Sequence, residues 1–305
     1  MKKIILSIIF SASTYLSFSQ GCSDAGFCSI GSVANNTEAN TAKTQLNKSF
    51  KLGSSFGIGE QEITVVTPYL QYEQALKNNW QVQLKATYNS ASKNEFSISD
   101  FGDIFFVVTK SWKQKKDGNI IANLGLKLPL GNDDKKSNGQ NLPLAFQSTL
   151  GTTDIIAGLT YQLKNWDFSA AAQIPLNKTN SNSFIEQPTN ATLNKFVSTR
   201  NFNRSSDVLL RGTRKFILNK KATLNGGLLA IYHLGNDAYT DLAGNTKSIN
   251  ESEGLTLNFT TSFGYQISNK LYFNLSAGTP LVVRTQRPDG LTRSFVIVPE
   301  IKYVF

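Results

Sequence analysis

The sequence has few of the residue types from which catalytic and metal sites are usually built. Its 305 residues include a single histidine, His233, and only two cysteines, Cys22 and Cys28. Two sulfurs without nearby histidines leave a transition-metal site short of ligands. We therefore expect neither a metal nor another cofactor.

Beyond the N-terminus the sequence also lacks a long hydrophobic run. Charged or amide side chains interrupt every apolar stretch before the ~20 consecutive apolar residues that a spanning helix needs. At the N-terminus, two lysines precede a short apolar run, Ile4–Phe10, and small residues follow at Ser17 and Ser19. This pattern is typical of a secretory signal peptide, which we assign to residues 1–19. Any membrane crossing by the mature chain must then use strands.

Positive charge is in excess but is not gathered into one stretch of the sequence. The formal net charge of +10 falls to +8 (10 minus 2) when Lys2 and Lys3 leave with the signal peptide. Nucleic-acid-binding domains usually concentrate their basic residues in a patch or stripe. We therefore expect no nucleic-acid partner.

From about residue 50 onward, apolar and polar residues alternate with the period of a strand. Segments 80–88, 119–130 and 255–266 show the alternation most clearly. They are longer than the ~5 to 6 residues of an average soluble strand and match the ~9 to 11 residues of a tilted transmembrane strand. The mean hydropathy of −0.22 does not contradict a membrane protein, because polar lumen-facing residues offset the lipid-facing ones.

The pattern predicts twelve strands, an even number as in single-chain bacterial barrels. They cover 48–59, 62–76, 80–90, 101–112, 119–130, 153–163, 166–176, 205–216, 222–234, 255–267, 271–282 and 294–305. Every second link is short (77–79, 113–118, 164–165, 217–221, 268–270), and the others are mostly long and polar (91–100, 131–152, 177–204, 235–254, 283–293), except the link after the first strand. Short periplasmic turns and longer extracellular loops characterise outer-membrane barrels. The predicted fold class is all-β, an antiparallel transmembrane barrel over residues 48–305 with both termini periplasmic.

Aromatic residues support the same architecture. All three tryptophans, Trp80, Trp112 and Trp166, adjoin short links, as expected for an aromatic girdle at one membrane interface. At the C-terminus, Tyr303 and Phe305 share one face of the last strand. This ending resembles the C-terminal strand signal that the barrel-assembly machinery is thought to read in bacterial outer-membrane proteins.

Three stretches resemble the putative outer-membrane channels of the MetA-pathway-of-phenol-degradation type. They are DFGDIFF at 100–106, GLKLPLG at 125–131 and LPLAFQSTLGTTDIIAGLTYQL at 142–163. That family is distantly similar to outer-membrane transporters of fatty acids and aromatic hydrocarbons. The resemblance implies a channel, with small hydrophobic or aromatic molecules as its expected solutes.

The alternation also identifies charged side chains that should face the barrel interior. These lumen-lining candidates are Lys51, Glu73, Lys85, Asp103, Lys127, Asp154, Asp207, Arg211, Lys215, His233, Glu300 and Lys302. Their mixed signs can either pair into a network that fills the lumen or line a polar path, because unpaired buried charge is costly. The acidic pair Asp133–Asp134 is expected to be a solvated loop group.

No catalytic residue is predicted. A nucleophile needs a base within hydrogen-bond reach, and in outer-membrane phospholipase A, another barrel of this size, the serine follows the histidine by two residues. Here Gly235 stands at that position after His233. We therefore expect a hydrogen-bonded lumen histidine and a protein that is not an enzyme.

Residues 20–47, rich in Ser, Asn, Thr and Gly, are too polar for a domain, and we predict a tail or a small plug. Within it, Cys22 and Cys28 are expected to form a local disulfide if the compartment is oxidising. Lipidation of Cys22 is the alternative, although Ser19-Gln20-Gly21 lacks the usual aliphatic residue three positions earlier.

Together these features predict a protein of the Gram-negative outer membrane. Its expected partners are outer-membrane lipid, the barrel-assembly machinery and a small solute that crosses passively. Two alternatives remain open at this stage. One is a barrel enzyme that acts on lipids, and the other is a structural or adhesive protein without transport.

Overall fold

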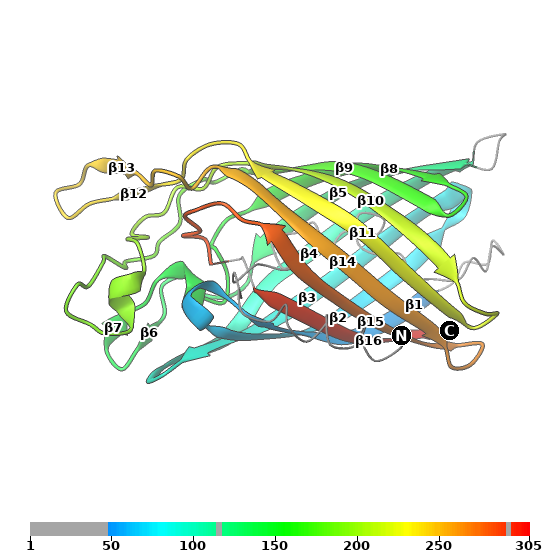
Figure 1. Ribbon diagram of the computed structural model, residues 1–305, viewed down its shortest axis with the longest axis horizontal. Helices are drawn as coiled ribbons and strands as arrows, with labels where there is room; N and C mark the ends of the chain where they lie inside the picture. The colour runs from blue at the N-terminus through cyan, green and yellow to red at the C-terminus, as the bar shows by residue number, and fades with distance from the viewer. Residues whose placement is uncertain (1–47, 114–117, 291–293) are drawn as a thin grey trace, which may run out of the picture.

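The chain forms a closed antiparallel barrel of twelve strands (Figure 1). This computed structural model describes residues 48–113, 118–290 and 294–305. Each barrel strand pairs with the next one along the chain, and the last pairs with the first. The strands are β1 (Lys48–Ile58), β2 (Thr64–Leu76), β3 (Trp80–Lys93), β4 (Phe96–Lys113), β5 (Gly118–Pro129), β8 (Asp154–Leu163), β9 (Trp166–Pro175), β10 (Asp207–Ile217), β11 (Ala222–His233), β14 (Gly254–Gln266), β15 (Leu271–Val282) and β16 (Phe295–Val304). The predicted fold class is confirmed.

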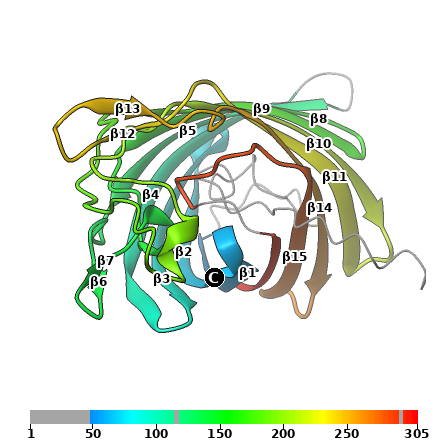
Figure 2. The ribbon, with the colours of Figure 1, turned by 60° about the vertical axis from the view of Figure 1, so that its left-hand side comes forward.

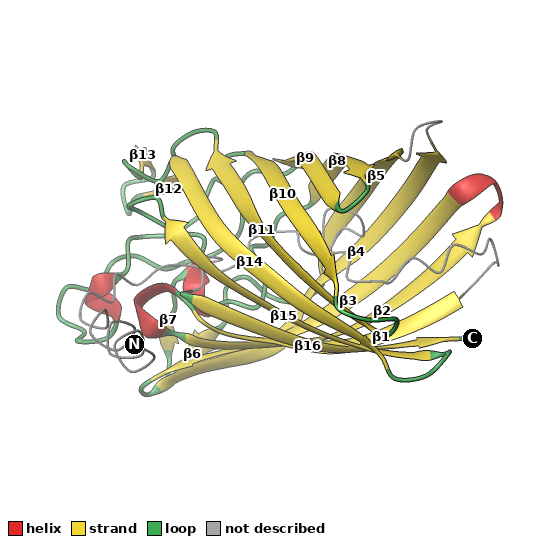
Figure 3. Ribbon diagram, turned by 45° about the vertical axis from the view of Figure 1, so that its right-hand side comes forward, coloured by secondary structure: helices red, strands yellow, loops and turns green. Residues whose placement is uncertain are grey.

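Short turns and long loops lie at opposite ends of the barrel, which we call the turn end and the loop end (Figures 1 and 3). The turn end carries the 3-10 turn η3 (Lys77–Asn79) and the links 164–165, 218–221 and 267–270. The loop end carries two small sheets and three 3-10 turns, namely β6 (Lys136–Ser137) with β7 (Gln140–Asn141), β12 (Ala238–Thr240) with β13 (Thr246–Ser248), η2 (Glu60–Glu62), η4 (Leu144–Phe146) and η5 (Leu193–Lys195). None of the helical turns in the described ranges is long and apolar enough to span a membrane.

The barrel closes where β1 pairs with β16, in a register that runs from Ser49 opposite Val304 to Ile58 opposite Phe295. At the end of this seam, the backbone N–H of Phe305 donates to the carbonyl oxygen of Lys48 at 3.0 Å. Closure removes the two edge strands that an open sheet would expose. Both ends of the described chain therefore lie at the turn end.

The outer surface of the barrel is apolar. Along each strand the outward side chains are mostly Leu, Phe, Ile, Val or Tyr, and Leu52 and Leu210 are each 64% exposed. The inward positions carry buried hydroxyl, amide and charged groups such as Thr160, Asn225 and Ser262. An apolar exterior around a polar interior inverts the arrangement of a soluble protein and suits a hydrocarbon environment.

One predicted link differs from the structure. Residues 91–100 were expected to form a long polar loop, but β3 continues to Lys93 and β4 begins at Phe96, so only two residues form the turn. Asn94 takes the left-handed conformation that such a tight turn requires (φ 52°). At the loop end β3 and β4 extend past the apolar outer surface as a hairpin. Phe96 and Ile98 stabilise this extension because they are buried against the loops.

The loops at this end have a hydrophobic core of their own. It joins the first extracellular link to residues of β2, β3, β4 and two long loops, and comprises Ile63, Val65, Ala91, Phe96, Ile98, Leu142, Ala145, Phe146, Phe184, Leu193 and Phe196. The ring of Phe146 lies 6.3 Å from that of Phe96 and 5.8 Å from that of Phe196. Aromatic packing at such distances adds to the hydrophobic stabilisation of the loop end.

Gly226 and Gly227 are neighbours in β11 with different surroundings. A Cβ atom on Gly227 would lie 2.3 Å from the carbonyl oxygen of Gly212 on β10, whereas a Cβ atom on Gly226 would meet nothing within 4 Å. We predict that Gly227→Ala lowers the free energy of unfolding by about 1 to 3 kcal/mol, because the backbone must shift. Gly226→Ala is the matched control and should not do so.

Urea unfolding followed by heat-modifiable gel migration measures both variants. Equal stability of the two would show that β10 and β11 tolerate a methyl group between them.

Candidate functional site

The inner wall of the barrel is where the predicted lumen-lining residues lie. All twelve occupy strand positions whose side chains are buried or half-buried, in alternation with the exposed apolar positions of the outer surface. Lys85, Arg211 and Lys215 lie on β3 and β10, opposite Phe105, Leu229 and Asn225, respectively. The remaining candidates gather into three groups of charges.

The first group lies at the seam. The register places Lys51 directly opposite Lys302, an arrangement of like charges that destabilises a strand pair unless it is neutralised. Glu73 on β2 provides the neutralising charge, with its carboxylate oxygens 3.0 Å from Lys51 Nζ and 3.2 Å from Lys302 Nζ. Glu300 accepts a hydrogen bond from the Tyr69 hydroxyl at 2.7 Å. These contacts join β1, β2 and β16 from the lumen side.

The second group crosses β4, β5, β8 and β9. Lys127 and Asp154 are register partners, and Lys127 Nζ lies 2.9 Å from Asp154 Oδ2, with both side chains almost fully buried. The Gln173 amide also donates to this carboxylate. Nearby, the Thr149 hydroxyl donates to Asp103 Oδ1 at 2.6 Å. Every charge in this group therefore has a fixed polar partner.

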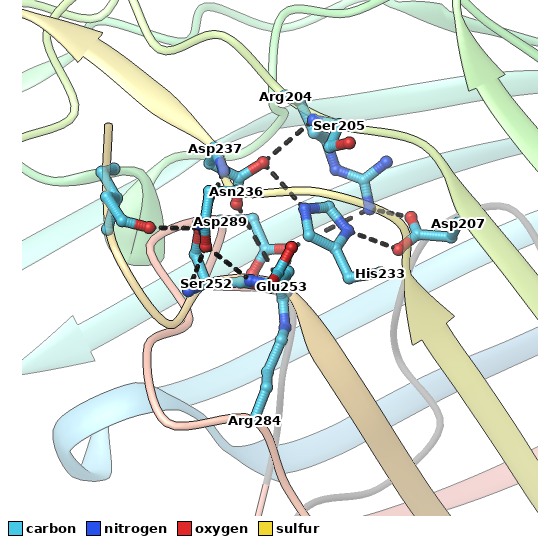
Figure 4. Close-up of polar contacts among 11 residues, drawn as sticks. Arg204, Ser205, Asp207, His233, Asn236, Asp237, Ser252, Glu253, Arg284 and Asp289 are labelled. Atoms are coloured by element: carbon cyan, nitrogen blue, oxygen red, sulfur yellow. Dashed lines mark hydrogen bonds and ion pairs between the residues drawn. The ribbon is translucent and has the colours of Figure 1, made fainter. Parts of the chain in front are cut away.

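The third group, which we call the mouth network, consists of Arg204, Asp207, His233, Asp237, Arg284 and Asp289 (Figure 4). His233, the last residue of β11, contacts Asp207 through Nδ1 at 2.6 Å and Asp237 through Nε2 at 2.8 Å. Arg204 NH2 lies 2.5 Å from Asp207 Oδ2. The histidine thus sits between a strand carboxylate and a loop carboxylate.

Arg284 extends the mouth network into the loop that follows β15. Its guanidinium binds Asp289 and donates to the Ser252 carbonyl oxygen at 2.8 Å. It also lies 3.7 Å from Asp237 Oδ2. Through these contacts three long loops (176–206, 234–253 and 283–290) are fastened together, and Figure 2 shows the last of them, in red, arching over the loop end.

Burial disfavours the charged forms of the loop residues in the mouth network, such as Arg204 and Asp289. The oppositely charged side chains beside them favour the charged forms more strongly. The carboxylates of Asp207 and Asp289 raise the pKa of Arg204 above its ordinary value despite burial. Burial alone would raise the pKa of Asp289, yet the guanidiniums of Arg284 and Arg204 hold it below its ordinary value. Because the pKa of Asp289 is lowered in the folded state, its stabilising contribution is complete above its ordinary pKa and is lost as the pH falls through the lowered value.

Two further contacts fasten the loops. Arg287 Nε lies 2.8 Å from Glu60 Oε2, which attaches the loop after β15 to η2. Asp133 accepts hydrogen bonds from the backbone N–H and the hydroxyl of Ser181, and Asp134 accepts the same pair from Ser183, all at 2.6 to 2.7 Å. The expectation that Asp133 and Asp134 are solvated was therefore wrong, because each carboxylate caps the facing loop.

One part of the otherwise polar inner wall is apolar. Six inward side chains on β4, β8, β9, β10 and β11 form one buried cluster, which we call the apolar wall patch: Val107, Ile156, Ala171, Leu209, Leu229 and Ile231. Leu209 pairs in register with both Ala171 and Ile231, so the patch is continuous across neighbouring strands. These side chains are inside the barrel and away from lipid, and they are almost fully buried, so they pack against one another as a hydrophobic cluster on the lumen side of the sheet.

The remaining predicted residues lie on the outer surface or outside the described ranges. Trp80, Trp112 and Trp166 are exposed at the turn end, and Tyr303 and Phe305 are exposed with their rings stacked 6.2 Å apart. The signal peptide (1–19), the N-terminal segment 20–47 and both cysteines, Cys22 and Cys28, lie outside the described residues.

Sequence reasoning missed the loop half of the mouth network. Arg204, Asp237, Arg284 and Asp289 lie in loops, where no alternation reveals which way a side chain points. One local signal was available, because Arg204 and Asp207 are three residues apart at the start of a strand. The partners across the mouth had no comparable signal.

We predict that Arg284→Gln releases the loops at the mouth. The substitution leaves Asp237 and Asp289 buried with less compensation, which costs about 3 kcal/mol or more. Limited proteolysis of the reconstituted barrel should then cut segments 234–253 and 283–290 at least about a hundredfold faster. In Lys247→Gln, which loses a partly exposed ion pair with Asp241, the rate should change little. Parent-like resistance of Arg284→Gln would contradict the fastening role.

The fold resembles that of a solved outer-membrane channel, and two further barrels are more distantly similar. Among solved structures, the COG4313 outer membrane channel from Pseudomonas putida F1 is similar, with 12% identity, 88% of this chain and 100% of that chain covered, and a TM-score of 0.59. The translocator domain of the autotransporter NalP from Neisseria meningitidis is 9% identical, with 87% of this chain and 90% of that chain covered and a TM-score of 0.49. The NanC porin is 9% identical, with 84% of this chain and 98% of that chain covered and a TM-score of 0.47. No curated protein matches the sequence.

The closed barrel and its apolar exterior make the protein an outer-membrane barrel, and in such barrels the end with the short turns faces the periplasm. Residues 32–295 match the family described as putative MetA-pathway of phenol degradation. The match spans most of the sequence, and the chain belongs to this family.

Proposed function

We propose that the protein is a channel through which small hydrophobic or aromatic molecules cross the outer membrane passively. The observation that carries this proposal is the apolar wall patch, formed by residues such as Leu209 and Leu229 on the inner wall. These side chains point away from lipid into the barrel interior, whereas the wall of a water-filled pore is lined mainly by polar groups. An apolar solute that inserts among these side chains is stabilised by roughly 25 cal/mol for each Å² of its own apolar surface that leaves water.

The paired charges of the wall support the same solute class. Lys127 is neutralised by Asp154, and Glu73 lies between Lys51 and Lys302. Fixed pairs of this kind hold the wall in shape and cancel much of each other's field, so they favour neither cations nor anions strongly. Selection by contact with the apolar wall patch then distinguishes solutes better than selection by charge.

The comparisons support the proposal at the level of the family and the fold. The family's description refers to phenol degradation, in which the substrates are aromatic. The similar barrel from Pseudomonas putida is described as an outer membrane channel. Passage of aromatic solutes through this chain would connect both descriptions.

We assign no catalytic step to His233. Both of its ring nitrogens contact carboxylates, those of Asp207 and Asp237, which leaves neither nitrogen directed at a serine or cysteine nucleophile. A barrel hydrolase would lose lipid or ester hydrolysis in His233→Ala. We expect the purified parent and this variant to have the same hydrolytic background.

Solute flux into liposomes tests the channel. We predict that the reconstituted protein admits phenyl glucoside faster, relative to glucose, than the difference in their sizes allows. Replacing Leu209 and Leu229 by Asn should lower this ratio by about fourfold or more, since each apolar methylene contact is worth ~0.8 kcal/mol. Both solutes are retained by protein-free liposomes, so the ratio reports the protein.

Ser262→Asn provides the matched control, because it adds an amide to the inner wall on β14, outside the apolar wall patch. Its ratio should remain that of the parent. Absence of flux for every solute would exclude a channel, and flux without an aromatic preference would leave a channel of a different solute class.

A further inference from the structure

The turn end carries a ring of positive charge. Nine lysine and arginine residues lie on its turns or at the adjoining strand ends, and all but one are exposed: Lys48, Lys77, Lys110, Lys113, Lys164, Arg214, Lys220, Lys221 and Lys270. No aspartate or glutamate occurs in the described turns at this end. Asp167 on β9 follows the 164–165 turn by two residues, but its side chain is half-buried at an inward position opposite Thr213. We call these nine residues the basic rim.

The opposite end of the barrel has no such excess. Its charges are mixed and form ion pairs, such as Lys135 with Asp100 at 2.8 Å and Arg287 with Glu60 at 2.8 Å. The formal net charge of the whole sequence is +10. In the described ranges the loop end thus carries charges of both signs, whereas the nine cations of the basic rim share their turns with no acidic residue, which places an excess of positive charge at one membrane interface.

Two members of the basic rim lie on the lipid-facing surface among the tryptophans. Lys110 Nζ is 4.9 Å from the ring centroid of Trp80 and donates to the carbonyl oxygen of Asn78 at 2.5 Å. The guanidinium carbon of Arg214 is 5.5 Å from the ring centroid of Trp166. Indole rings prefer the zone between headgroups and hydrocarbon. These two cations are therefore held at the depth of the lipid headgroups.

We propose that the basic rim binds anionic phospholipid headgroups of the periplasmic leaflet. The ring contributes residues from the start of β1, from the ends of β4 and β10 and from four turns around the barrel, so a leaflet that surrounds the protein can meet all of them at once. A protein partner docked on one side would meet only a few. Each lysine or arginine close to an anionic membrane surface attracts it, and the attraction is screened within a Debye length.

The three tryptophans make this contact directly measurable. They are the only tryptophans in the sequence, and all lie beside the basic rim, so the intrinsic fluorescence of the full chain reports the lipid at this interface. The protein is reconstituted in mixed vesicles of phosphatidylglycerol and phosphatidylcholine, in which first one lipid and then the other is brominated to quench indole emission. The two quenching curves yield a relative association constant for the anionic lipid.

At low salt we expect phosphatidylglycerol to be preferred over phosphatidylcholine on the order of fivefold. This factor corresponds to the attraction of one lysine or arginine at each lipid site. The preference should fall toward one at 1 M salt. It should also fall toward one in a variant with Lys77, Lys110, Lys164 and Arg214 replaced by Gln. Because each ratio is taken within one protein, a change in indole emission caused by the substitutions cancels.

A control variant with Lys136, Lys178, Lys195 and Lys247 replaced by Gln loses the same number of cations from exposed positions at the loop end. It should keep the parent's preference. A parent ratio near one would overturn the proposal and leave a non-lipid partner as the target of the rim. A preference that survives in the rim variant would also overturn it, because other groups would then carry the binding.

Discussion

The closure of the backbone hydrogen-bond ladder is the constraint on which the rest of this structure depends. A bilayer core supplies no water to an unpaired N–H or C=O group, so a sheet that crosses it must have no free edge. The pairing of β1 with β16 satisfies this requirement. Once the ladder is closed, strand alternation assigns one side-chain set to lipid and the other to the lumen. The apolar wall patch and the paired charges are all consequences of that assignment.

Buried charge in the lumen is tolerated because it is placed by register. Lys127 meets Asp154 as a direct cross-strand partner, and Glu73 lies beside the opposed Lys51 and Lys302. Removing either partner of such a pair would leave a charge in a poorly solvated interior. At the mouth the same principle operates between loops, where Arg284 holds Asp289 and reaches Asp237. Wall and loops are thus held by the same kind of contact in two different settings.

Much of the fold was predictable because a strand that separates lipid from lumen must alternate. The period of two located all twelve strands and assigned inward positions to residues as far apart as Lys51 and Glu300. Link lengths predicted which end carries the loops. The predicted loop at 91–100 was wrong because polarity was taken to mean irregular backbone, whereas β3 and β4 continue there as a hairpin supported by the buried side chain of Phe96.

The candidate site was less predictable than the fold. Alternation states which face a residue occupies but not which partner it meets, so the pairing of Lys127 with Asp154 could not be derived without the register. In loops even the face is undefined. The contacts of Asp133 with Ser181 and of His233 with Asp237 depend on how the loops fold over the mouth, and no local pattern in the sequence encodes that path.

The seam between β1 and β16 also bears on the kinetics of folding. Every other barrel pairing joins strands that follow one another along the chain, and most of these can form as local hairpins. The seam alone joins Ser49 to Val304, at opposite ends of the barrel sequence. Contacts of such high contact order form slowly, because the chain must lose most of its freedom before they yield any stabilisation. Docking of β16 on β1 is thus the natural last step of assembly, and the ion pairs of Glu73 with Lys51 and Lys302 become complete only when that step is finished.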